Sequence, residues 1–461
     1  MFVFLPVVLL LYYITPRKYR NFMLLIVNLV FYAWGEPCFI ILMLVSIAVN
    51  YVSGLVISKF KNGDKPNPKA AKATLIISII INIGLLVFFK YAGFIGNTLK
   101  VILPFLNIPV LEIPLPIGIS FYTFQTMSYT IDVYRNDTKA QKNIVTFGTY
   151  VSLFPQLIAG PIVRYRDVEH QLEHRKENLS QFNNGVKLFV IGLCKKVLLA
   201  NQMGAFWDIL RENFTNGGIL AAWFGILAYS LQIYFDFCGY SEMAMGLGNM
   251  FGFDFLKNFD YPYISKSITE FWRRWHISLS TWFREYIYIP LGGNRKGFPR
   301  QVFNMLVVWA LTGLWHGANY NFILWGLYFF VILFFEKLFM LKALKKIPSV
   351  FQHIYSLLLI VLGWLIFYFE DMGQLWNYFG VMFGTSGIFV SANALSDIIS
   401  YLPIFVIAVF ACTPLAKKLY DKIPKNNLSV SIDTVGCMLG LLLSTASLAS
   451  SGYNPFLYFK F

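Results

Sequence analysis

The sequence predicts an all-α protein that crosses a membrane many times, with roughly eleven transmembrane helices plus re-entrant or interfacial helices. Of its 461 residues, 57% are hydrophobic and only 13% are charged, whereas charged residues make up about a quarter of a soluble domain. Apolar segments long enough to span a bilayer recur along the whole length, and short loops rich in lysine and arginine separate many of them. This combination is typical of polytopic α-helical membrane proteins and leaves no long polar stretch for a separate soluble domain.

Basic loops set the predicted orientation of the chain, because lysine and arginine gather on the cytoplasmic side. After a first apolar segment at residues 1–14, Arg17, Lys18 and Arg20 indicate a cytoplasmic loop and place the N-terminus outside. The first segment lacks a basic leader and a small-residue cleavage site, so we expect a retained membrane segment. The last apolar segment, at about 430–449, runs outward and places the C-terminus outside as well.

The same reasoning predicts the segments between these ends. Intermediate spans are expected at about 21–34, 39–57, 73–92, 117–134, 182–203, 219–237, 301–316, 319–336, 353–369 and 401–415. Residues 144–160 have basic segments on both sides, so we expect a re-entrant or interfacial hairpin, broken at Pro155 and at Gly160. Residues 93–116 are expected to form an external connection, and residues 238–300 a basic region at the cytoplasmic face.

The formal net charge of +15 is assigned to membrane orientation, since no RNA- or DNA-binding module is visible and no nucleic-acid partner is expected. The five cysteines are scattered in or beside apolar segments without a CxxC pair, which indicates small core residues. His170 and His174 have the i, i+4 spacing that can bind a metal. No third ligand is evident in this charged segment, so the sequence predicts no metal site.

His316 ends an apolar run that begins at Asn304 at the basic face. A helix of about 13 residues is roughly 20 Å long, so His316 is expected near or beyond the middle of the membrane. Gly313 shares its helix face and leaves room for a ligand or a neighbouring helix, and Gly317 can end the helix. Ionisable groups at such depth usually serve a function, and a neutral imidazole suits a general base. The alternative is a core histidine that is hydrogen-bonded to a helix.

His276 lies forty positions earlier, in a basic and tryptophan-rich segment. On a continuous helix it would share a face with Trp272 and Arg273, and Trp272 and Trp275 suit the membrane interface. Arg273 and Arg274 can meet the phosphates of a soluble cofactor or merely lipid headgroups. The alternative to a binding site is an interfacial amphipathic helix.

Three acidic residues, Asp236, Glu242 and Glu270, flank the same region. They can pair with its arginines or assist a histidine, and the sequence leaves both possibilities open. The glycine-rich run at residues 245–252 lies in membrane-type sequence, and we assign it to helix packing.

In combination, five segments resemble the membrane-bound O-acyltransferase family and, within it, the bacterial alginate O-acetyltransferase branch. They are LFPQLIAGPIVRYRDV (153–168), YFDFCGYSEMAMGLGNMFGFDFLKNFDYPY (234–263), FWRRWHISLSTWFREYIYIPLGGNR (271–295), LTGLWHGANYNFILWG (311–326) and NPFLYFKF (454–461). The likeness covers most of the chain from about 115 to 326, plus the C-terminal tail.

The resemblance implies a fold of many helices around a central tunnel through the membrane. It implies one membrane domain over residues 1–461, with a catalytic core at about 115–340 and peripheral helices on either side, at 1–114 and 341–461. The family transfers an acyl group from a cytoplasmic thioester to a hydroxyl. Its near-invariant histidine falls on His316, the expected general base, and its second histidine position falls on His276.

On this basis His276 would orient the thioester or stabilise charge on its carbonyl oxygen. Trp272, Arg273, Arg274 and Trp275 would contact the donor on the cytoplasmic side.

For the alginate-type branch the resemblance implies an acetyl group, with acetyl-CoA or another acyl thioester as donor substrate and no bound cofactor. The acceptor is a hydroxyl of an exported polysaccharide or of an extracytoplasmic acetyltransferase partner, and the location is the bacterial cytoplasmic membrane. The teichoic-acid D-alanylation branch, which draws on an acyl carrier protein, is the alternative. The segments at 160–168 and 454–461 and the greater length favour the alginate branch.

Two other classes of protein stay open at the level of the sequence. One is a polysaccharide or lipid transporter that uses His316 as a proton relay. The other is a non-catalytic membrane scaffold for an export complex.

Overall fold

The structure, a computed structural model of the full chain, describes residues 3–106, 113–157, 160–424, 426–450 and 456–457. Within these ranges the regular structure is helical and contains no β-strand, which confirms the all-α prediction. Eight helices in the described part are long and apolar enough to cross a membrane, and the shorter α1 (Phe4–Ile14) is apolar as well. The chain is a multi-pass membrane protein, and the count of roughly eleven spans stays a prediction.

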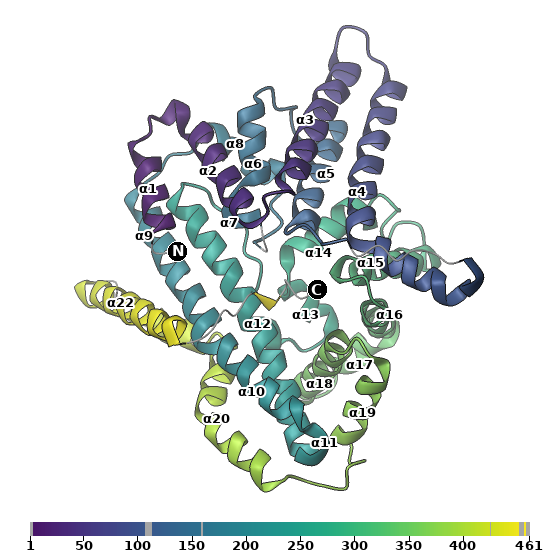
Figure 1. Cartoon of the computed structure of the whole chain (residues 1–461), viewed down its shortest axis with the longest axis vertical. Helices are drawn as coiled ribbons and strands as arrows, with labels where there is room; N and C mark the ends of the chain where they lie inside the picture. The colour runs from purple at the N-terminus through teal and green to yellow at the C-terminus, as the bar shows by residue number, and fades with distance from the viewer. Residues whose placement is uncertain (1–2, 107–112, 158–159, 425, 451–455, 458–461) are drawn as a thin grey trace. The chain divides into compact units, whose positions relative to one another are not determined.

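The described residues fall into two compact units (Figure 1). The first unit takes in Met1–Leu188 and Ala244–Leu256, and the second takes in Phe189–Met243 and Lys257–Phe461. The chain passes between them inside α9 (Leu179–Cys194) and inside α12 (Ile219–Met250). The expectation of one domain with a catalytic core at about 115–340 stays a prediction.

Helix packing in the first unit is supported by polar side chains. Its elements are α1, η1 (Arg17–Tyr19), α2 (Arg20–Gly35), α3 (Ile40–Asn62), α4 (Pro68–Ile102), η2 (Pro104–Leu106), α5 (Ile119–Arg135), α6 (Ile144–Ser152), α7 (Phe154–Leu157), α8 (Tyr165–His174) and parts of α9 and α12. Asn50 of α3 and Asn82 of α4 are buried, and their amides exchange hydrogen bonds of 3.0 and 2.9 Å. Such polar side chains find partners across helices because the bilayer supplies none.

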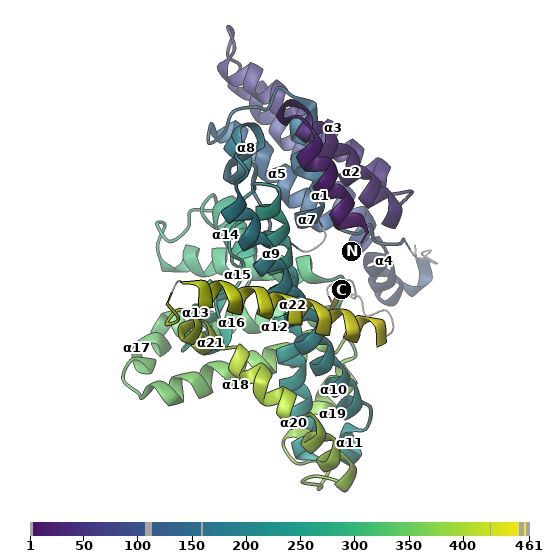
Figure 2. The same ribbon diagram turned by 90° about the vertical axis from the view of Figure 1, so that its left-hand side faces the viewer.

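The second unit contains two consecutive helices that are separated by a short break just after His316. Its further elements are η3 (Lys195–Ala200), α10 (Asn201–Glu212), α11 (Phe214–Gly217), η4 (Pro262–Ile264), α13 (Ile268–Arg274), α14 (Ile277–Phe283), η5 (Arg284–Tyr288), α15 (Phe298–His316), α16 (Tyr320–Phe335), η6 (Glu336–Met340), α17 (Leu341–Leu344), α18 (Ser349–Tyr368), α19 (Met372–Met382), α20 (Ala392–Ala411), α21 (Leu415–Tyr420) and α22 (Asn427–Ser450). In Figure 2, α22 is the long yellow helix, which contacts η3.

Helices α15 and α16 form the predicted helical pair and touch through glycine. A Cβ atom built on Gly313 would lie 2.4 Å from the carbonyl oxygen of Phe322 and 3.4 Å from the Cα of Gly326. The space beside Gly313 therefore holds the neighbouring helix, which decides between the two possibilities that the sequence left open.

Two predicted boundaries are wrong. Helix α4 continues to Ile102, so residues 93–102 are helical, because no proline interrupts the chain between Pro68 and Pro104. Helix α12 continues beyond residue 237 to Met250.

The first part of the glycine-rich run, residues 245–250, continues α12, and the helix ends at Met250, before Gly252 with its φ of +81°. A Cβ atom on Gly185 of α9 would lie 2.6 Å from the carbonyl oxygen of Gly246, which confirms helix packing for this run. The 144–160 segment forms two short helices, α6 and α7, which separate at Leu153, so the predicted break at Pro155 is wrong; proline is tolerated in the first turn of a helix such as α7. Residues 158 and 159 of this segment lie outside the described residues. The five cysteines, all within the described ranges, form no disulfide; Cys238 and Cys412 are buried as expected, but Cys38 is exposed.

Candidate active site

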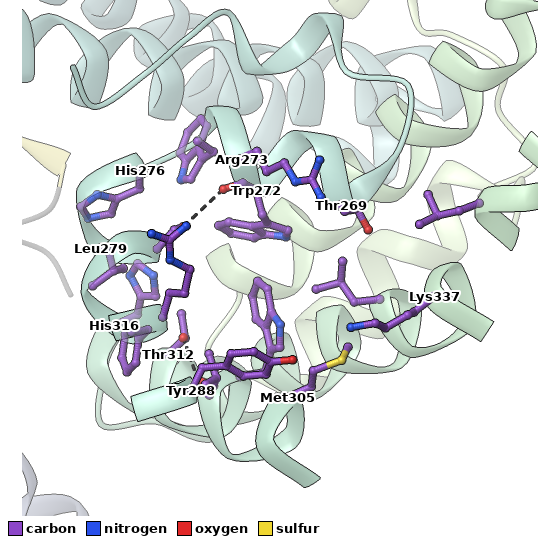
Figure 3. A pocket seen from close by; sticks show the side chains of 18 residues that line it. Thr269, Trp272, Arg273, His276, Leu279, Tyr288, Met305, Thr312, His316 and Lys337 are labelled. Carbon is purple, nitrogen blue, oxygen red and sulfur yellow. Dashed lines mark hydrogen bonds between the residues drawn. The ribbon is translucent and has the colours of Figure 1, made fainter. Parts of the chain in front are cut away.

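A cavity of about 390 Å³ lies within the second unit (Figure 3). Its lining residues are Thr269, Trp272, Arg273, Trp275, His276, Leu279, Ser280, Phe283, Arg284, Tyr288, Met305, Val308, Trp309, Thr312, His316, Leu333, Lys337 and Leu341. Figure 3 shows His276 and His316 together at one end and Lys337 at the opposite end. The cavity thus brings together both predicted histidines, which are forty residues apart in the sequence.

His316 is the last residue of α15 and is buried, with 7% of its surface exposed. Its ring centroid lies 5.0 Å from that of Trp325 and 5.3 Å from that of Phe367, in edge-to-face geometry. The following Gly317 has an extended backbone, which ends the helix as the sequence predicts. His316 also lines a second cavity of about 30 Å³ that lacks His276, so its imidazole borders two cavities.

Asp236, one of the three flanking acids, lines the smaller cavity. Asp236 is 1% exposed, forms an ion pair of 2.5 Å with Lys196, and accepts a hydrogen bond of 2.7 Å from the backbone N–H of Leu457. Glu242 pairs with Lys195 at 2.5 Å. These two carboxylates therefore pair with lysines of η3, rather than with arginines.

His276 differs from its prediction, because it does not lie on a continuous helix. Helix α13 ends before it and α14 begins after it, and His276 itself has a left-handed backbone with φ of +46°. Backbone hydrogen bonds of 2.9 Å join Asp260 N–H to Arg274 O and Ile277 N–H to Asn258 O, so the 258–260 segment replaces helical partners on both sides. This kink turns the segment into two short helices around the histidine.

The side chain of His276 is 1% exposed and contacts an amide. Its Nδ1 lies 3.1 Å from Oδ1 of Asn258. Burial lowers the pKa of His276 to about 3, so the imidazole is neutral at physiological pH.

Three of the four residues predicted to contact the donor line the large cavity: Trp272, Arg273 and Trp275. The indole Nε1 of Trp272 is buried and has no hydrogen-bond partner among the described residues. Burying a donor in this way is costly unless a ligand or water satisfies it.

Arg274 is not among the lining residues. Its guanidinium lies 2.9 Å from Glu270 and 3.3 Å from Asp260, so it pairs with carboxylates beside the cavity. The contact of Arg274 with a donor stays a prediction. Of the three flanking acids Asp236, Glu242 and Glu270, it is Glu270 that pairs with an arginine, which the sequence had left open.

Sequence reasoning missed Arg284 and Lys337, which add two cations to the cavity wall. Arg284 lies four residues after Ser280 and Lys337 four residues after Leu333, so each shares a helix face with a neighbour that lines the cavity. In the sequence both are single charges in or beside basic segments, and only the packing of distant helices shows that they face the same cavity.

Glu336, which precedes Lys337 in η6, also went unnoticed. Its buried carboxylate accepts hydrogen bonds from the backbone N–H groups of Ile268 and Thr269, at 2.6 and 2.7 Å, and from the Thr269 hydroxyl at 2.6 Å. It thereby fixes the first turn of α13, the helix that carries Trp272 and Arg273.

His170 and His174 lie in the first unit, with ring centroids 5.2 Å apart. Across the described ranges, no group of three or more histidine, cysteine, aspartate or glutamate side chains has a metal-binding arrangement.

Comparison with known proteins gives a consistent result. The model of the membrane-bound O-acyltransferase family matches residues 119–371, more than half of the chain. A probable alginate O-acetylase of Pseudomonas aeruginosa is 44% identical over 83% of this chain and 73% of its own length. One of Azotobacter vinelandii is 38% identical over 100% of this chain and 98% of its own. A peptidoglycan O-acetyltransferase of Helicobacter pylori is 30% identical over 100% and 96%.

These matches include the helices that surround the large cavity and run well beyond it on both sides. The chain belongs to the membrane-bound O-acyltransferase family and is an O-acyltransferase.

Proposed function

We propose that the protein moves an acetyl group from a cytoplasmic thioester, with acetyl-CoA as the first candidate, to a hydroxyl on the outer side of the membrane. The acceptor is an exported polysaccharide or an extracytoplasmic acetyltransferase partner. The relatives named above as alginate O-acetylase and peptidoglycan O-acetyltransferase support an acetyl group and a polymer. The observation that carries the proposal is that one cavity is lined by both histidines and by three cations, with Lys337 at the end opposite the histidines.

The cationic part of the cavity supports a phosphate-bearing donor. Arg273, Arg284 and Lys337 supply positive charge where the phosphates of a coenzyme thioester would bind. The acyl end would then reach past Trp272 towards the histidines. The donor is a substrate that leaves after each turnover, so we propose no bound cofactor.

His316 is the proposed general base. The acceptor oxygen attacks the thioester carbonyl carbon while the imidazole takes the hydroxyl proton. A C–O bond forms, the C–S bond breaks, and the leaving thiolate takes the proton from the imidazolium. General-base assistance of this kind contributes about 10²–10⁴-fold to a rate. His316 lies at one end of the large cavity, where the acyl end of a donor bound at the cations would arrive.

The buried indole N–H of Trp272 is available to bind a carbonyl oxygen of the donor. We propose a bacterial cytoplasmic-membrane location, with both chain ends outside, the lipid bilayer as surroundings and no nucleic-acid partner. In this arrangement the basic residues of the cavity face the cytoplasmic donor.

The test is transfer of labelled acetyl by the purified full-length protein, supplied with acetyl-CoA and with candidate acceptors. His316→Ala should lower the rate by about 10²-fold or more. His174→Ala is the matched control, because this exposed histidine lies outside the cavity. Equal rates for wild type and His316→Ala would contradict the role of His316.

A parallel assay with an acylated carrier protein tests the alternative donor. Transfer from the carrier but not from acetyl-CoA would overturn the coenzyme proposal. Movement of an acceptor polymer across vesicles without acyl transfer would instead indicate transport.

A further inference from the structure

The orientation of one amide fixes the protonation of His276. The side-chain atom of Asn258 that faces Ser278 lies 3.2 Å from the Ser278 backbone nitrogen and 2.9 Å from its hydroxyl. A backbone N–H can only donate, so this atom must be the amide oxygen. The same oxygen lies 3.1 Å from Nδ1 of His276, and because an amide oxygen only accepts, Nδ1 must carry the proton.

Because burial keeps the imidazole neutral, a proton on Nδ1 leaves the lone pair on the other ring nitrogen, Nε2. It is buried and has no hydrogen-bond partner among the described residues. The rings around His276 belong to Phe237, Phe259 and Trp315, with centroids 4.7, 6.4 and 5.9 Å away, and none of them carries charge. Nothing in the described surroundings favours an imidazolium.

The backbone shows that this arrangement is held against strain. A non-glycine residue such as His276, with φ of +46°, keeps this unfavourable backbone conformation only where contacts with its surroundings hold it there. Asn258 does this twice, since its side-chain oxygen binds Nδ1 and its backbone oxygen accepts from Ile277 N–H at 2.9 Å. The kink and the tautomer of His276 thus have a common cause.

We infer that His276 is a fixed hydrogen-bond acceptor in the large cavity, and that Asn258 is the positioning residue that sets it. Its Nε2 takes a hydrogen bond from an N–H or O–H group of a substrate, either an amide of the donor's thioester-bearing arm or the acceptor hydroxyl. A neutral Nε2 has no proton to give, so His276 does not stabilise charge on the thioester oxygen. This inference rests on the proposed acyl transfer for its substrate, but not for its tautomer.

The tautomer is tested directly by ¹⁵N NMR of the full-length protein in detergent, with its five histidines labelled. Spectra of His276→Gln identify the signals of His276. The inference expects an unprotonated Nε2 and a protonated Nδ1 from about pH 5.5 to 8. A protonated Nε2 or an imidazolium in that range overturns it. This readout needs no enzymatic activity, so it stays valid if the proposed donor is wrong.

The second test adds charge to the positioning residue. Asn258→Asp keeps an oxygen acceptor beside Nδ1, and its carboxylate stabilises the imidazolium and raises the pKa of His276. Protonation then removes the lone pair, so acetyl transfer should fall by about tenfold between pH 8 and 5.5 relative to wild type. Faster transfer of the variant at low pH would mean that Nε2 acts as a donor, and an unchanged profile would mean that it meets no substrate group.

The other charged groups near His276 are the same in the wild type and in Asn258→Asp. Arg273, Arg284, Lys337 and His316 share its cavity. On the 258–260 segment, Asp260 is paired with Lys257 and Arg274. On α12, Asp236 is paired with Lys196. The difference between the two pH profiles therefore isolates the new carboxylate.

The third test identifies the substrate group and does not depend on Asn258→Asp folding. His276→Gln keeps an acceptor atom, and His276→Met keeps only the bulk. Met should lose about tenfold more activity than Gln, since a lost hydrogen bond of about 1.4 kcal/mol corresponds to tenfold. A rise of KM for the thioester indicates the donor amide, and a rise of KM for the acceptor indicates its hydroxyl. Equal activity of the two variants overturns the acceptor role.

Discussion

Gly317 shows how little freedom the residue after His316 has. A Cβ atom at this position would lie 2.1 Å from Cε2 of Phe322. The ring of Phe322 packs 5.0 Å from that of Phe367, which in turn packs 5.3 Å from the ring of His316. The absence of a side chain at 317 therefore lets this aromatic group close around the histidine.

Gly317→Ala should displace Phe322 and, through Phe367, the imidazole of His316. Overpacking of this kind costs about 1–3 kcal/mol, so we expect a lower Tm in detergent and slower acetyl transfer. Gly35→Ala is the control, because a Cβ there meets no atom within 4 Å. Wild-type Tm and rate for Gly317→Ala would contradict this account.

Lys337 offers a test of the donor at the scale of one charge. Lys337→Ala should raise KM for acetyl-CoA by about tenfold, because a charged hydrogen bond to phosphate contributes about 1.5–3 kcal/mol. The KM for a short acetyl thioester without phosphates should not change. Lys342→Ala, an exposed lysine of the neighbouring α17, is the matched control. An equal rise of KM for both thioesters would show that Lys337 does not bind the phosphates.

At the scale of elements, α13 depends on an acid that is distant in sequence. The helix is only seven residues long, and the buried carboxylate of Glu336 binds the two backbone N–H groups at its start. Negative charge at a helix N-terminus is favourable, and a short helix cannot hold itself in place. The π-helical turn η6 thus supplies both the anchor of α13 and, at Lys337, a cation of the cavity.

Glu336→Gln should loosen α13, because one of its two side-chain terminal atoms becomes a donor that faces backbone donors. We expect a loss of stability of about 1–3 kcal/mol and a lower kcat/KM for acetyl transfer. Thermal unfolding in detergent and the labelled-acetyl assay measure the two effects. The exposed Glu212, replaced by Gln, provides the control. Retention of both wild-type values would show that the cap does not position the cavity wall.

At the scale of the whole molecule, orientation in the membrane follows from where the basic residues lie. Residues 59–72 are rich in lysine, whereas residues 370–400 carry no lysine or arginine. The positive-inside rule predicts that the first stretch lies in the cytoplasm and the second outside.

Cysteine labelling checks this orientation. In a variant without the five native cysteines, Lys65→Cys should react with a membrane-impermeant thiol reagent only after the cells are opened. Thr385→Cys should react in intact cells. The cysteine-free parent gives the background. Reversed labelling of the two positions would invert the proposed direction of transfer.

The helical membrane class and the position of His316 at a helix end could be derived from the sequence, because both depend on hydropathy over short stretches of the chain. Hydropathy predicted a multi-pass helical membrane protein, and the apolar run from Asn304 predicted His316 at the end of a helix. The boundary at 93 was wrong because no proline interrupts the chain between Pro68 and Pro104, and the boundary at 237 was wrong because α12 continues through Gly239 and Gly246, which pack closely against neighbouring backbone.

The sequence by itself determined the helical membrane class and, with the family resemblance, singled out His276 and His316 as candidate site residues. Only the tertiary structure decided what surrounds them. Arg284 and Lys337 face one cavity and Glu336 binds the start of α13 because distant helices pack together, and the kink at His276 depends on Asn258, eighteen residues away. These features come from packing and hydrogen bonds between distant segments, which helical periodicity does not encode.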